Sequence, residues 1–152
     1  MNTVVAIKGT FDPTFPPSTW LPMKRERVPG RELAELIQSG LSQRGFNAEE
    51  VSYEEPFYVT RCRSGNYRYE ILSYIYDPDE AGAVWVVECA PQLGLWAKLM
   101  GKTEAQELGA VLKAINETLR GDSRVKEGRW FTKLPASPFA AEKYGRSPTE
   151  AA

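Results

Sequence analysis

The stretch FYVTRCRSGNYRYEILSYIY, residues 57–76, decides the fold of this chain. Aromatic and β-branched runs at 57–63 and 67–76 flank the tripeptide Ser64-Gly65-Asn66, whose last two residues tolerate positive φ. We read this pattern as a β-hairpin with a three-residue turn. A third, mostly apolar run at 83–89 follows. Three such runs in succession predict an antiparallel meander.

Apolar stripes at helical spacing predict two helices, at about 30–44 and 103–120. Gly45 stands where a left-handed residue would end the first helix, and Phe46 would supply the hydrophobic contact that accompanies such a cap. The Thr103-x-x-Gln106 pattern predicts a capping box at the start of the second helix. Each helix has one apolar face, and therefore must bury it against the sheet.

Shorter runs at 4–7 and about 125–132 predict two further strands, so the expected order is β-α-β-β-β-α-β. This order predicts an α+β fold, a two-layer sandwich with two helices packed on one face of an antiparallel sheet. We expect one domain over 1–132, which contains a long proline-rich loop at 10–29 that its aromatic residues pin to the domain. Residues 133–152 are expected to be a flexible C-terminal tail.

The 152-residue chain contains no histidine, which removes the base of Ser/His and Cys/His nucleophile systems and the usual nitrogen ligand of zinc. We therefore predict no catalytic residues, no metal site and no cofactor. A net charge of −1 disfavours nucleic acid as a partner, and no apolar run is long enough for a membrane span. The first eight residues lack a secretory signal pattern, and Cys62 and Cys89 suggest free thiols. We expect a cytoplasmic protein.

Tyrosine and arginine are concentrated in the predicted hairpin, since six of the seven tyrosines lie between residues 53 and 76. If Arg63 pairs with Tyr67, then Arg61 faces Tyr69, and the guanidinium groups share a face with the phenol rings. That composition is typical of protein–protein hot spots, although tyrosine also favours ordinary strands. The predicted partner-binding residues are Tyr58, Arg61, Arg63, Tyr67, Arg68, Tyr69 and Trp96.

Two further features leave alternatives open. Trp96, in the apolar segment 93–100, would either anchor an exposed docking element or fold onto the core. Glu88 interrupts an apolar strand; if buried it could act as a general acid or base, and by alternation it would instead lie on the open face with Val84 and Val86.

In size, element order and lack of catalytic motifs, residues 1–132 resemble the small α/β immunity proteins that neutralise bacterial toxins. The resemblance implies a non-catalytic module that binds and blocks a protein partner, such as a toxin or a secreted effector. The first alternative is a secretion-chaperone-like protein, although such chaperones usually begin with a helix and dimerise. The second is a small carboxylate-dependent enzyme that uses Glu88, because glycoside-type chemistry needs only two carboxylates.

Overall fold

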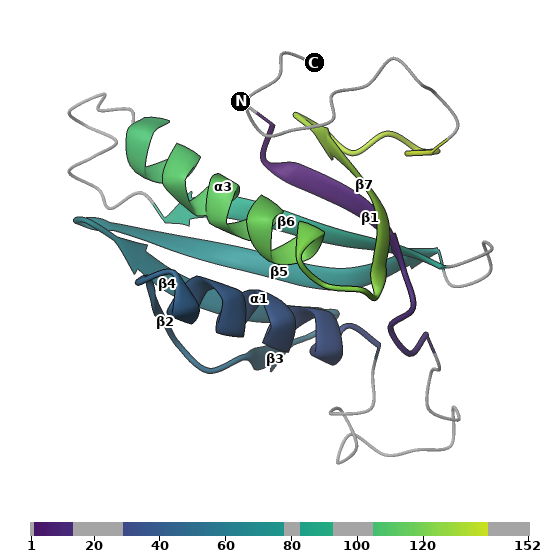
Figure 1. The fold of residues 1–152 in the computed structure, drawn as a ribbon, viewed down its shortest axis with the longest axis horizontal. Helices are drawn as coiled ribbons and strands as arrows, with labels where there is room; N and C mark the ends of the chain where they lie inside the picture. The colour runs from purple at the N-terminus through teal and green to yellow at the C-terminus, as the bar shows by residue number, and fades with distance from the viewer. Residues whose placement is uncertain (1, 14–28, 78–82, 93–104, 140–152) are drawn as a thin grey trace.

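The computed structural model describes residues 2–13, 29–77, 83–92 and 105–139. In these parts of the chain seven strands form one antiparallel sheet in the order β2-β4-β5-β6-β1-β7, and β3 pairs with β4 beside β2 (Figure 1). The strands are β1 (Val4–Gly9), β2 (Asn47–Ala48), β3 (Ser52–Glu54), β4 (Phe57–Ser64), β5 (Tyr67–Asp77), β6 (Val84–Gln92) and β7 (Val125–Phe131). The helices are α1 (Arg31–Gln43) and α3 (Ala105–Arg120).

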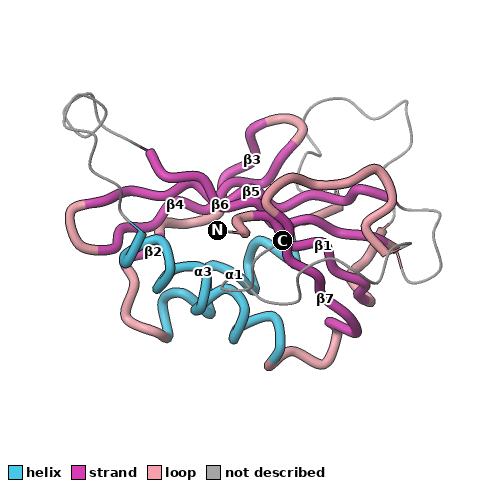
Figure 2. The backbone as a smooth tube through the Cα atoms, turned by 90° about the horizontal axis from the view of Figure 1, so that it is seen from above, coloured by secondary structure: helices cyan, strands magenta, loops and turns pink. Residues whose placement is uncertain are grey.

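The two helices lie on one face of the sheet, which confirms the predicted α+β sandwich (Figure 2). The predicted meander is the β4-β5-β6 sequence, and β1 lies between β6 and β7. Successive side chains of a strand point to opposite faces, and one set from each strand packs under the helices. The core on this side includes Ile7, Ile71, Trp85, Leu33, Ile37, Leu112, Ile115 and Trp130.

The end of α1 follows the predicted cap. Gly45 has φ of +86°, and its N–H donates to the Ser42 carbonyl at 3.2 Å. The Phe46 N–H donates to the Leu41 carbonyl at 3.1 Å, which completes a Schellman motif. Phe46 also packs against the core, as predicted. The predicted capping box of the second helix begins at Thr103, which lies outside the described residues.

Helices α1 and α3 touch at a glycine. A Cβ placed on Gly40 would overlap Thr118 Oγ1 and Cγ2 and would lie 2.7 Å from Thr118 Cβ. Thr118 is itself held, since its hydroxyl donates to the Ala114 carbonyl at 2.7 Å. An exposed ion pair between Arg44 and Glu117, at 3.4 Å, also links the two helices. The helices can approach this closely only because Gly40 has no side chain.

The opposite face of the sheet, which we call the far face, is covered at the β1-β6-β7 end by the chain that follows β7. Ala6, Val84 and Phe131 form a second small core there, against which Leu134 and Phe139 pack. The Tyr76 hydroxyl donates to the Ala136 carbonyl at 3.1 Å. The described part of the predicted tail, residues 133–139, is therefore packed rather than free. The rest of the predicted tail, residues 140–152, lies outside the described residues.

The start of the predicted proline-rich loop behaves as expected. Phe11 is buried, and its ring meets the Trp85 ring edge-on at 5.6 Å between centroids. The Arg124 guanidinium lies over the same ring at 4.8 Å. Residues 14–28, which include the other aromatic side chains of this loop, lie outside the described residues. Among the described helices, neither has the length and apolar character of a membrane span.

Both cysteines are buried free thiols on the helix side of the sheet. Burial raises the pKa of Cys62 to about 11 and raises the pKa of Cys89 further, because the thiolate loses its hydration in the core. β5 separates their strands, which fits the prediction that they form no disulfide.

The raised thiol pKa values predict alkaline instability. The unfolded chain releases these protons above about pH 9, whereas the folded chain keeps them, so stability present below that pH is lost as the pH rises. For Cys62 the expected loss by pH 10 is on the order of 1 kcal/mol. Urea unfolding at pH 8 and pH 10 measures it, and Cys62→Ala should reduce the difference. An equal pH dependence in wild type and Cys62→Ala would contradict the prediction, as would rapid labelling of the folded thiols by a thiol reagent at pH 8.

Candidate functional site

The register of the β4-β5 hairpin places its side chains differently from the prediction. Ser64 pairs with Tyr67, Arg63 with Arg68, and Arg61 with Glu70. The turn therefore has two residues, not three, and its first residue, Gly65, has φ of +63°, as in a type II′ turn. A one-residue change of register moves every side chain of one strand to the other face. The predicted pairing of Arg63 with Tyr67 is wrong because the turn is one residue shorter than predicted, and the side chains of one strand therefore lie on the opposite face.

The three tyrosines among the predicted partner-binding residues lie on the helix side of the sheet, away from the arginines. Tyr69 is 0% exposed and Tyr58 is 2% exposed, and Tyr67 is half-buried against the same core. Tyr58 also contacts the Tyr53 ring, at 5.0 Å between centroids. Tyr58, Tyr67 and Tyr69 therefore do not form the predicted surface plate. The predicted anchor Trp96 lies outside the described residues.

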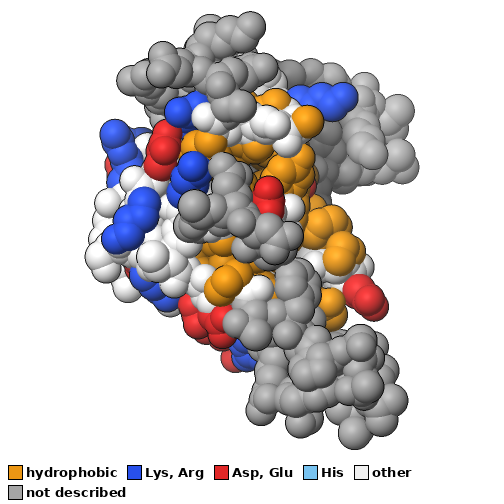
Figure 3. Space-filling model, turned by 90° about the vertical axis from the view of Figure 1, so that its right-hand side faces the viewer, with side chains coloured by type: hydrophobic (Ala, Val, Ile, Leu, Met, Phe, Trp, Pro, Cys, Tyr) orange, Lys and Arg blue, Asp and Glu red, His pale blue; other side chains and the backbone are white. Residues whose placement is uncertain are grey.

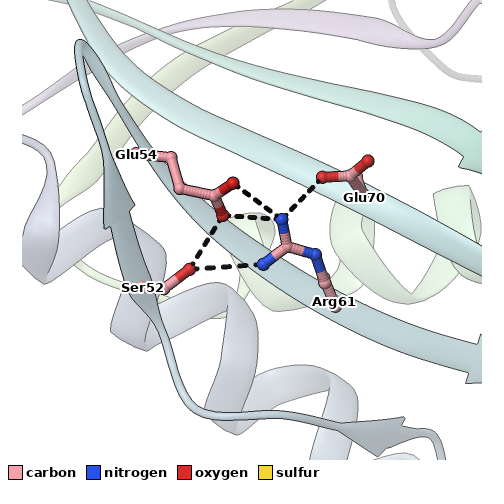
Figure 4. Close-up of polar contacts among 4 residues, drawn as sticks. All are labelled: Ser52, Glu54, Arg61 and Glu70. Atoms are coloured by element: carbon pink, nitrogen blue, oxygen red, sulfur yellow. Dashed lines mark hydrogen bonds and ion pairs between the residues drawn. The ribbon is translucent and has the colours of Figure 1, made fainter.

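Arg61 is the centre of a polar cluster on the far face (Figure 4). One of its terminal nitrogens contacts Glu54 Oε2 at 2.6 Å and Glu70 Oε2 at 3.0 Å. Its other terminal nitrogen donates to Ser52 Oγ at 3.4 Å, and the Ser52 hydroxyl donates to Glu54 at 3.0 Å. Side chains from β3, β4 and β5 are thus joined by one guanidinium group. The cluster fixes the position of Arg61 and satisfies its charge.

The electrostatics of this cluster follow from its hydrogen bonds. The hydrogen bond from Arg61 lowers the pKa of Glu54, and the Ser52 hydroxyl lowers it further. Glu54 in turn raises the pKa of Arg61. Both glutamates are partly exposed, and exposed ion pairs contribute little to stability. The cluster therefore contributes mainly by joining β3, β4 and β5 through the Arg61 side chain beside the hairpin tip.

Arg63 and Arg68 lie directly opposite each other at the tip of the hairpin, and we call this pair the arginine tip. Both side chains are exposed on the far face, and the structure shows no ion pair for either of them among the described residues. Like charges directly opposite each other across two strands are destabilising. The two adjacent cations therefore contribute no stability to the folded chain.

A hollow of about 140 Å³ lies beside the arginine tip. Asn47, which pairs with Arg63 across β2 and β4, contributes to its wall, together with Glu49. Arg61, Cys62, Arg63 and Arg68 complete the lining. Guanidinium groups donate in a planar fork that matches carboxylate and phosphate oxygens. This hollow is the right size for one such group, and Glu49 is the acidic residue in its wall.

The rest of the exposed far face carries other aromatic side chains. The Phe57 and Tyr74 rings pack at 5.0 Å between centroids, and Tyr76 is 39% exposed. Glu88 is half-buried on this face, where its Cα partners are Val4 and Leu72. It therefore follows the open-face alternative for its position. Burial raises the pKa of Tyr74, and the charge of Glu88, which accepts a hydrogen bond from the tyrosine, raises it further.

The sequence analysis named the three arginines of the hairpin but not the residues of β2 and β3 that lie beside them. Asn47 and Ser52-Tyr53-Glu54 lie in strands of two and three residues, too short to show periodicity. The register of the hairpin could have been predicted from the dipeptide Gly65-Asn66, which is typical of a two-residue hairpin loop. Reading it so would have placed Tyr74 and Tyr76, rather than Tyr67 and Tyr69, on the face of the arginines.

The described residues contain no group of three or more Cys, Asp and Glu side chains placed to hold a metal ion. Comparison of the chain with family models, with curated proteins and with solved structures found no match. The far face is a partly aromatic sheet surface, and the two arginines at one end of it form no ion pair with the described residues.

Proposed function

We propose that this chain is a non-catalytic protein-binding module that holds a partner protein against the far face, in the manner of an immunity-type inhibitor. The observation that carries the proposal is the arginine tip, in which Arg63 and Arg68 face each other with no carboxylate paired to either in the described structure. An acidic group on a partner would neutralise both cations. Such a contact would offset the repulsion that the free protein sustains.

The surface beside the arginine tip supports the same proposal. Arginine and tyrosine are the residue types that dominate binding energy at protein interfaces. Phe57, Tyr74 and Tyr76 lie on the same face, and the Arg61 cluster keeps the intervening strands in one arrangement. A rigid surface loses little conformational entropy when it binds. A partner with an acidic rim and an apolar centre fits this face.

Charge reversal of the arginine tip should separate binding from stability. Arg68→Glu places a glutamate opposite Arg63, so the free energy of unfolding should rise by about 0.2–1 kcal/mol. The same change should weaken capture of an acidic partner at least about tenfold, because it removes one cation and adds repulsion. Urea unfolding measures the first effect. Quantitative pull-down from the native host, followed by mass spectrometry, measures the second.

The matched control is a double variant with the same change in net charge at positions away from the far face. Arg63→Glu with Arg68→Glu should lose the partner, while Arg31→Glu with Lys113→Glu, both at exposed positions of the two helices, should keep it. A partner that the first double variant retains would exclude the arginine tip as its binding site. Turnover of a substrate by the purified protein, lost in Glu88→Gln, would favour the enzyme alternative instead.

A further inference from the structure

A second, larger hollow lies on the helix side of the sheet, away from the arginine tip. Its volume is about 570 Å³, within the range of small-molecule sites. The C-terminal half of α3 forms one wall and β7 the other, and the buried side chains of Val5, Ile7 and Trp130 lie at its base. Figure 3 views this end of the molecule, where Lys and Arg side chains gather on the side of the helices.

Gly128 lies in the middle of β7 and lines this hollow. Its φ is outside the positive range that calls for glycine. A Cβ at this position would lie 3.4 Å from Ile7 Cγ2 and 3.7 Å from Val5 Cγ2, which are ordinary van der Waals contacts. Neither the backbone conformation nor steric crowding therefore requires a glycine at position 128. In a strand interior, such a glycine often marks a bulge, a tight bend or a close approach by a ligand or another backbone.

Hydrogen-bond donors surround the opening. Asn116 Oδ1 accepts from Trp130 Nε1 at 3.0 Å, so the amide nitrogen of Asn116 keeps its two donors for another group. Lys126 Nζ donates to the Ser123 carbonyl at 2.8 Å and retains further N–H donors. Arg120, the last residue of α3, is exposed and forms no ion pair with a described residue.

Glu127 is the acidic residue that lines the hollow, and its negative charge is paired within the protein. Glu127 forms an ion pair with Arg129 at 3.0 Å, and Arg129 also lies over the Phe139 ring on the far face. The charges left to the hollow are those of Arg120 and Lys126. We propose that this hollow binds a small organic anion, with its carboxylate or phosphate between Arg120, Lys126 and Asn116 and its apolar body over Gly128.

The test uses 2-naphthoate as the anionic probe and 2-naphthamide as its neutral counterpart, with binding followed by NMR. Naphthoate should shift the Trp130 indole and Asn116 side-chain amide resonances in a saturable manner, and naphthamide should bind about tenfold more weakly because it lacks the charge. Shifts confined to Arg63 and Arg68, equal affinity for the two probes, or no binding at millimolar concentration would each overturn the proposal.

Variants at the hollow make the test specific. Gly128→Leu should abolish binding by filling the opening, while Gly128→Ala, whose Cβ meets only ordinary contacts, should keep most of it. Arg120→Gln and Lys126→Gln should each weaken naphthoate about threefold to fivefold, as partly exposed ion pairs do. Unchanged affinity in Gly128→Leu with an intact NMR spectrum would place the probe elsewhere. Because the arginine tip is untouched, this result is independent of partner capture.

Discussion

Gly40→Ala should lower the free energy of unfolding by about 1–3 kcal/mol, although alanine is the better helix former. The new methyl group would overlap the side chain of Thr118, which is buried and anchored to the Ala114 carbonyl. Because Thr118 is β-branched, it has few other rotamers to adopt. The helices must therefore move apart, and the core between them loses contact. Urea or thermal unfolding monitored by circular dichroism measures the loss.

Gly109→Ala in α3 is the matched control, because a Cβ at that position would have no described atom within 4 Å apart from its chain neighbours and the backbone of its own helix. That variant should gain up to about 1 kcal/mol, or roughly 2–4 °C in Tm for a chain of this size. Combining Gly40→Ala with Thr118→Ala should cost less than the sum of the two single changes, since the overlapping Oγ1 and Cγ2 atoms are gone. Equal gains at both glycines would contradict the close approach of α1 and α3.

Tyr69→Ala should lower the free energy of unfolding by about 3–5 kcal/mol, the usual cost of emptying a large aromatic site in a core. Tyr69 is 0% exposed and packs in the cluster that contains Ile71, Trp85 and Cys62. At this cost a large share of the total stability of a domain is lost. Failure of Tyr69→Ala to bind a partner would therefore report unfolding, not a lost contact.

Tyr76→Ala provides the comparison, because Tyr76 lies on the far face, is 39% exposed and makes one hydrogen bond to Ala136. Its expected cost is about 0.5–1.5 kcal/mol. The two variants together test the hairpin register. A Tyr69→Ala variant no less stable than Tyr76→Ala would mean that Tyr69 faces solvent, and the pairing of Arg63 with Tyr67 would be restored.

The elements with strong local signals were predictable from sequence. The first helix was expected at 30–44 and spans Arg31–Gln43, and Gly45 ends it as expected. Helix formation and capping depend on residues a few positions apart, so the chain itself carries the information. The strands β2 and β3 were missed because their formation depends on pairing with β4, which is a contact across the sheet.

The candidate site shows the same division. Arg61, Arg63 and Arg68 were selected by residue type, and the structure places all three on one face. Their neighbours were not predictable, because a turn of two residues in place of three exchanges the faces of an entire strand. Phe57, Tyr74 and Tyr76 therefore accompany the arginines, and Tyr58 and Tyr69 fill the core.

Local pattern by itself determined the helices, the meander strands, the absence of histidine chemistry and the arginine-rich hairpin. Tertiary structure decided the register of that hairpin, the closeness of α1 and α3 at Gly40, and the packing of residues 133–139. The reason is physical: propensity and periodicity act over a few residues, whereas register and burial depend on which distant surface is available to cover each side chain.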